Sequence, residues 1–103
     1  MNLTSPPVDL SVLAGQSGGD ADLEREVLTL FAERVPTDLE HIKAVSGEGR
    51  RAAAHRIVGS ARAIGAGEVA RLARAVERGE GDAAALEAAI AKATEFIARY
   101  LAG

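Results

Sequence analysis

Apolar residues recur every three or four positions along most of this chain, and polar residues fill the positions between them. This spacing gathers the apolar residues on one face of an α-helix. No stretch shows the strict alternation of apolar and polar residues that is typical of a half-buried strand. The pattern predicts a short helix at about 9–14 and four longer helices at about 20–45, 50–64, 68–78 and 82–101.

Glycine, proline and aspartate mark the ends of these helices. Asp20 and Asp82 are predicted N-caps, and Gly15 is expected to end the short first helix. Pro36 is expected to bend the second helix without dividing it, because the apolar spacing continues across it. Connections of about three to five residues make consecutive helices antiparallel. We therefore predict an all-α fold, an up-down-up-down four-helix bundle with a short additional N-terminal helix.

Composition limits the possible functions. The chain has 103 residues, of which 48% are hydrophobic and 26% charged, as expected for one globular domain. We expect residues 1–7 to form a flexible lead and residues 8–103 to form the domain. The net charge of −3 argues against non-specific binding to nucleic acid. The chain has no cysteine and no apolar run near the length that spans a membrane, so we expect a cytoplasmic protein.

The helix expected at 50–64 presents a histidine opposite its core stripe. His55 faces away from the apolar side, with Arg51 one turn before it and Arg62 two turns after it. Val58 and Gly59 lie one turn after His55. The predicted core stripe consists of Ala53, Ile57, Ser60, Ala61 and Ile64.

This combination suggests chemistry with phosphate. A neutral imidazole is a good nucleophile near pH 7, and guanidinium groups attract phosphate. A glycine inside a helix costs about 1 kcal/mol relative to alanine. Gly59 therefore suggests that a partner approaches closely beside His55. The alternative is that His55 is an ordinary polar residue on the surface.

The run Ala54-His55-x-Ile57-x-Gly59-Ser60-Ala61, followed by Gly65-Ala66, resembles the histidine-containing phosphotransfer (HPt) domains of bacterial phosphorelays. The tail of the family pattern is matched by Val69, Leu72-Ala73 and Val76-Glu77. The likeness extends more loosely over about residues 8–101. It implies that His55 accepts a phosphoryl group from the aspartyl phosphate of a receiver domain, or passes one to it. The implied partners are receiver domains, including that of a hybrid histidine kinase. The receiver supplies magnesium and most catalytic groups, so we expect a monomeric carrier that is not itself an enzyme and has no cofactor or metal.

The chain departs from the family pattern at one position. The lysine that usually stands three residues after the histidine is Val58 here. Its positive charge could instead come from Arg51, Arg56 or Arg62. We expect these arginines, together with Val58 and Gly59, to form the surface on which a partner docks.

Two other functions stay open. The chain could be an interaction module that binds a receiver or kinase without efficient transfer, or a structural bundle in which His55 has no role. A kinase is excluded by size, since the chain has no room for a nucleotide-binding domain. His41 has no second ligand at a suitable spacing, so the sequence predicts no metal site.

Overall fold

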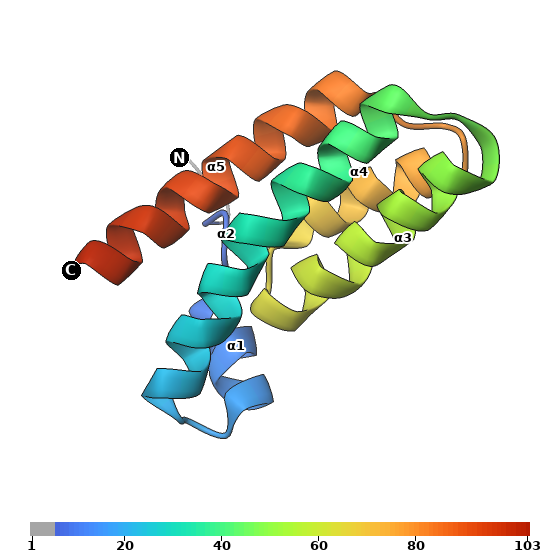
Figure 1. The fold of residues 1–103 in the computed structure, drawn as a ribbon. Helices are drawn as coiled ribbons and strands as arrows, with labels where there is room; N and C mark the ends of the chain where they lie inside the picture. Colours follow the sequence, from blue (N-terminus) through green and yellow to red (C-terminus); the bar gives the residue numbers. More distant parts are fainter. Residues whose placement is uncertain (1–5) are drawn as a thin grey trace, which may run out of the picture.

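A computed structural model describes residues 6–103, and within that range it contains five helices and no strand (Figure 1). The predicted all-α fold is confirmed. Residues 1–5 of the predicted N-terminal lead lie outside the described residues. The helices are α1 (Leu10–Ser17), α2 (Ala21–Ala44), α3 (Gly47–Ile64), α4 (Gly67–Glu77) and α5 (Ala83–Ala102).

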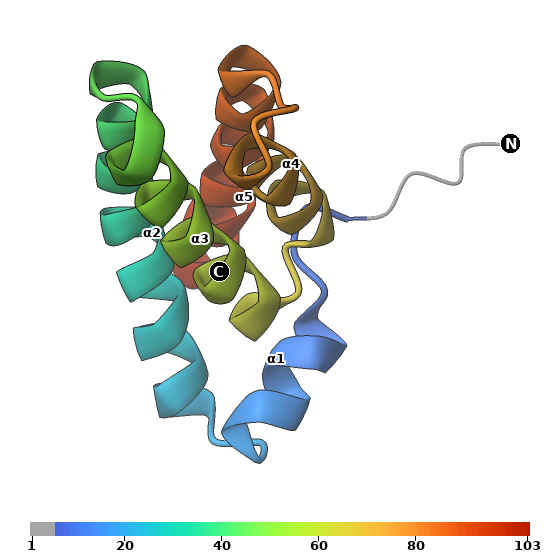
Figure 2. The same cartoon turned by 90° about the vertical axis from the view of Figure 1, so that its right-hand side faces the viewer.

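Helices α2 to α5 form the bundle. Each packs against the next one along the chain, and α5 also packs against α2, which closes the ring (Figures 1 and 2). Helix α1 contacts α2 and α3 at one end of the bundle. The predicted arrangement of four helices with a short additional one is confirmed. None of the helices described is long and apolar enough to cross a lipid bilayer.

The helix boundaries follow the predicted signals with two differences. Asp20 and Asp82 cap α2 and α5, accepting hydrogen bonds from backbone N–H groups in the first turn, and α2 continues unbroken through Pro36. Helix α1 does not end at Gly15 but continues to Ser17, because helices tolerate an interior glycine. Helix α3 begins at Gly47, three residues earlier than predicted.

The core consists of apolar side chains from all five helices and from the segment before α1. Among the described residues, no polar or charged residue is buried. Four members of the predicted stripe on α3, namely Ala53, Ile57, Ala61 and Ile64, are fully buried, and Ser60 is half-buried. The core therefore holds α3 firmly between its neighbours.

Gly65 holds α1 against the end of α3. Its φ angle of +72° lies in the left-handed region, which suits glycine. The backbone N–H of Asp9 donates a hydrogen bond of 2.9 Å to the carbonyl of Gly65. A Cβ atom at Gly65 would lie 2.7 Å from the Asp9 carbonyl oxygen. The close approach of α1 therefore requires a glycine here.

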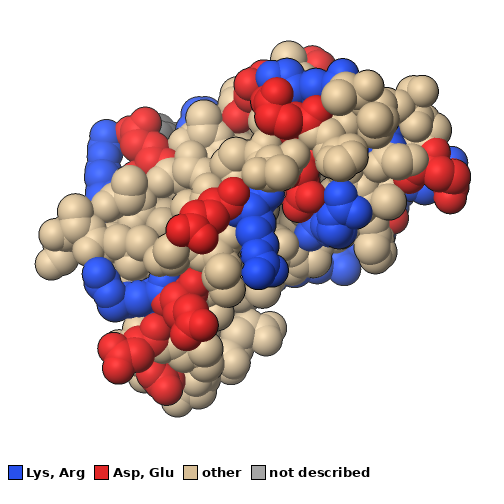
Figure 3. Space-filling model, viewed as in Figure 1, with Lys and Arg blue, Asp and Glu red and all other residues tan. Residues whose placement is uncertain are grey.

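Charge is unevenly distributed over this fold. Residues 6–33 contain six acidic residues and one arginine, whereas residues 47–78 contain seven arginines and three glutamates. Acidic side chains accordingly gather over the start of α2, whereas α1 itself has no charged residue (Figure 3). The hairpin of α3 and α4 is the basic part of an acidic protein.

Candidate functional site

His55 lies in the middle of α3 and points to solvent. Its side chain is 74% exposed, which confirms the orientation predicted from the helical period. Ala54 before it and Ile57 after it are buried in the core. The backbone that carries His55 is thus fixed by packing on one side, while the imidazole is accessible on the other.

A carboxylate from another helix holds the His55 ring. Oε2 of Glu77, the last residue of α4, lies 2.8 Å from Nδ1 of His55. The Glu77 side chain is 26% exposed. The helical spacing of the sequence did not predict this contact. Spacing relates residues of the same helix, and within α3 no carboxylate lies one turn from His55. The one signal in the sequence was the position of Val76-Glu77 in the tail of the family pattern.

The contact with Glu77 selects one form of the imidazole. When Nδ1 carries the proton, Nδ1–H donates to the carboxylate and Nε2 keeps its lone pair. A carboxylate that accepts from one ring nitrogen fixes the tautomer and the orientation of the ring. In this tautomer the Nε2 atom of His55 faces solvent in a fixed orientation, with its lone pair available.

Gly59 leaves an open space beside His55. It is exposed, and a Cβ atom added to it would meet no other atom within 4 Å. Packing within the chain therefore does not require a glycine at this position. The bare backbone one turn after His55 is available to a molecule that approaches from outside.

Val58 does not lie on the exposed stripe, and the prediction that it is a docking contact is wrong. Its side chain is only 3% exposed and belongs to the core. The physical reason is that α3 packs against α1, α2 and α4, so it buries a wider arc than one stripe. Ala54 and Val58 form a second buried row beside the predicted one.

The three arginines proposed to replace the family lysine differ in their surroundings. Arg51 pairs with Glu48 at 2.6 Å, and Arg56 pairs across to α2 with Asp38 at 3.0 Å. Arg62 is exposed and forms no ion pair with any residue in the described range. Arg62 therefore carries the one guanidinium of the three that is not already neutralised.

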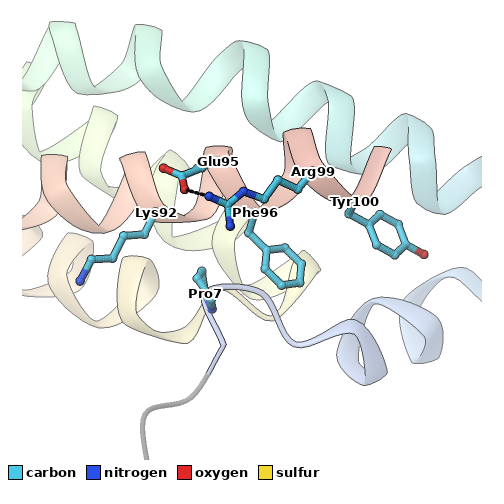
Figure 4. Close-up of a pocket in the computed structure, with 6 residues that line it drawn as sticks. All are labelled: Pro7, Lys92, Glu95, Phe96, Arg99 and Tyr100. Carbon is cyan, nitrogen blue, oxygen red and sulfur yellow. Dashed lines mark hydrogen bonds and ion pairs between the residues drawn. The ribbon is translucent and has the colours of Figure 1, made fainter. Parts of the chain in front are cut away.

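One hollow within residues 6–103 lies apart from His55. A hollow on α5 is lined by Pro7, Phe96 and Tyr100, with Glu95 and Arg99 paired at its edge (Figure 4). It includes no residue of α3 or α4. No three histidine, cysteine, aspartate or glutamate side chains converge anywhere in residues 6–103 in a way that could hold a metal ion.

Comparison with known proteins agrees with this geometry. The family model described as "Hpt domain" matches residues 26–103. The structure is similar to the crystal structure of the histidine phosphotransferase ShpA from Caulobacter crescentus, with a TM-score of 0.80 and 28% sequence identity over 92% of this chain and 90% of that chain. No curated protein matches the sequence significantly. The chain belongs to the Hpt domain family and is an intermediate of phosphorelays.

Proposed function

We propose that His55 is the residue that carries the phosphoryl group, taking it from the aspartyl phosphate of a receiver domain or returning it to one. The observation that supports this most is the pair of His55 and Glu77, which leaves Nε2 exposed and oriented. Gly59 lets the receiver approach this nitrogen.

The transfer step follows from the geometry. Nε2 attacks phosphorus in line, the N–P bond forms, and the P–O bond to the receiver's aspartate breaks with its electron pair leaving on the carboxylate. Nδ1–H stays hydrogen-bonded to Glu77, whose negative charge stabilises the positive charge that develops on the ring.

The chain supplies the nucleophile and its orientation, and the receiver supplies the rest. The magnesium ion and the acidic pocket around the aspartyl phosphate belong to the receiver, so this chain acts as a carrier and not as an enzyme. Arg62 provides positive charge where the family lysine is missing. The receiver of a hybrid histidine kinase is one such partner, and we propose that the chain works as a monomer in the cytoplasm.

The test is transfer from a set of phosphorylated receivers, with His55→Gln and His41→Gln compared side by side. His41 is the only other histidine and is exposed on α2, so His41→Gln is a matched control. We expect acid-labile, alkali-stable label on the wild type and on His41→Gln, and none on His55→Gln.

Two results would contradict the proposal. Label that persists on His55→Gln would place the phosphoryl group elsewhere. No label on the wild type from any competent receiver would favour an interaction module, provided that receiver binding survives in His55→Gln.

A further inference from the structure

A basic hollow borders the pair of His55 and Glu77. It lies between the start of α3 and the end of α4, and Glu77 is part of its wall. Four arginines line it: Arg50, Arg51, Arg74 and Arg78. We call these four residues the arginine hollow.

Two of the four guanidinium groups have no partner in the described chain. Nη1 of Arg50 donates a hydrogen bond of 3.3 Å to the carbonyl of Ile42, and Arg51 pairs with Glu48. Arg74 and Arg78 form no ion pair with any residue of the described range 6–103. The carboxylate nearest to them along the chain, Glu77, is already hydrogen-bonded to His55. The hollow therefore has an excess of positive charge.

We propose that the arginine hollow is a second docking contact for the receiver and selects receivers by the carboxylates that they place against Arg74 and Arg78. This rests on the proposed role of His55 as phosphoacceptor. A receiver that presents an aspartyl phosphate with magnesium must gather carboxylates around the phosphorus. When the phosphorus reaches Nε2 of His55, these carboxylates approach Glu77 as well.

The hollow compensates for the repulsion that Glu77 would otherwise cause. Like charges facing each other across an interface disfavour binding. Arg74 and Arg78 lie on either side of Glu77 in the sequence, three residues before it and one residue after it. The acidic start of α2 repels an acidic partner, so the receiver is steered to the hairpin of α3 and α4.

The test compares the double variant Arg74→Gln/Arg78→Gln with Arg71→Gln. Arg71 lies on the same helix but is held by Glu68 through two hydrogen bonds of 2.8 Å and is not part of the hollow. Two donors are used, a phosphorylated receiver that transfers to the wild type and the small donor phosphoramidate. Arg74 is half-buried, so replacing it also changes the packing around it. Arg78 is exposed, and the single variant Arg78→Gln is therefore expected to fold like the wild type.

We expect the double variant to raise the KM for the phosphorylated receiver on the order of tenfold, with the rate at saturation unchanged. Arg78→Gln should raise the KM by a smaller factor, and Arg71→Gln should leave it unchanged. The KM of the wild type should rise with salt, and this dependence should weaken in the double variant. Phosphoramidate should label His55 equally in all four proteins.

Three results would contradict either the docking role of the hollow or the proposed function. An unchanged KM and salt dependence in the double variant would overturn the role of the hollow while leaving His55 as the phosphoacceptor. Loss of labelling by phosphoramidate in a folded double variant would also overturn it, because the arginines would then act on His55 itself. A wild type that takes phosphate from phosphoramidate but from no receiver would contradict the proposed function instead.

Discussion

Nδ1 of His55 and Oε2 of Glu77 lie 2.8 Å apart although 22 positions separate the two residues in the chain. The contact joins the middle of α3 to the last residue of α4. The orientation of the imidazole therefore depends on how the α3 and α4 hairpin packs, and not on α3 alone.

Replacing Glu77 tests whether it orients the imidazole. We expect Glu77→Ala to slow labelling of His55 by phosphoramidate about tenfold, as removal of a group that orients a functional histidine commonly does. Glu77→Gln should slow labelling less than Glu77→Ala, because its side-chain carbonyl still accepts from Nδ1–H although the negative charge is lost. In ¹⁵N spectra of the ring, the wild type and Glu77→Gln should show mainly the Nδ1–H tautomer, and Glu77→Ala a mixture. Equal labelling rates and equal spectra in all three proteins would show that Glu77 does not orient the imidazole of His55.

Gly59→Ala should make the protein more stable but should slow phosphotransfer from a receiver. The added methyl group meets no atom within 4 Å apart from the backbone of its own helix and its chain neighbours. Because the substitution also removes a helical glycine, we expect stabilisation of up to about 1 kcal/mol in urea unfolding. Transfer from a receiver should nevertheless become slower, because the methyl group obstructs the approach to His55. Gly15→Ala, at another open helical position in α1, should stabilise without changing transfer. Unimpaired transfer by Gly59→Ala would mean that no partner comes close at this residue.

Val58→Lys should destabilise the protein and not restore a family-like site. The side chain at this position is buried, and placing an ammonium group there costs about 2 kcal/mol or more. Ala52→Lys, on the exposed face of the same helix, should change the free energy of unfolding by less than about 0.5 kcal/mol. Urea unfolding followed by circular dichroism measures both. A Val58→Lys protein as stable as the wild type would show that the lysine reaches solvent without disturbing the core.

Gly65→Ala should weaken the attachment of α1. Gly65 and Gly79 both have φ angles near +75°, at +72° and +78°, but only Gly65 has Asp9 and Val12 against it. We expect Gly79→Ala to cost about 1–2 kcal/mol from backbone strain alone. Gly65→Ala should cost more, and amide hydrogen exchange should become faster in α1. Equal costs for the two variants would mean that the contact of Asp9 with Gly65 adds nothing to stability.

Local periodicity was sufficient to predict the five helices and the exposed face that carries His55. It did not predict the burial of Val58. A single apolar stripe is expected for a helix that packs on one side, whereas α3 packs against three helices. It also failed for Glu77, because its contact with His55 depends on the crossing of α3 and α4, which the spacing within either helix does not determine. Arg74 and Arg78 were missed for the same reason, since the hollow exists only where two helix ends meet.

The residues of the proposed site are concentrated in the hairpin of α3 and α4. His55, Glu77, Gly59 and the arginine hollow all fall within residues 47–79, and the other three helices supply the base on which this segment rests. The residues to which we assign recognition and chemistry thus lie in one continuous third of the chain. Under the proposed function, substitutions confined to this hairpin should therefore be able to change which receiver the protein serves.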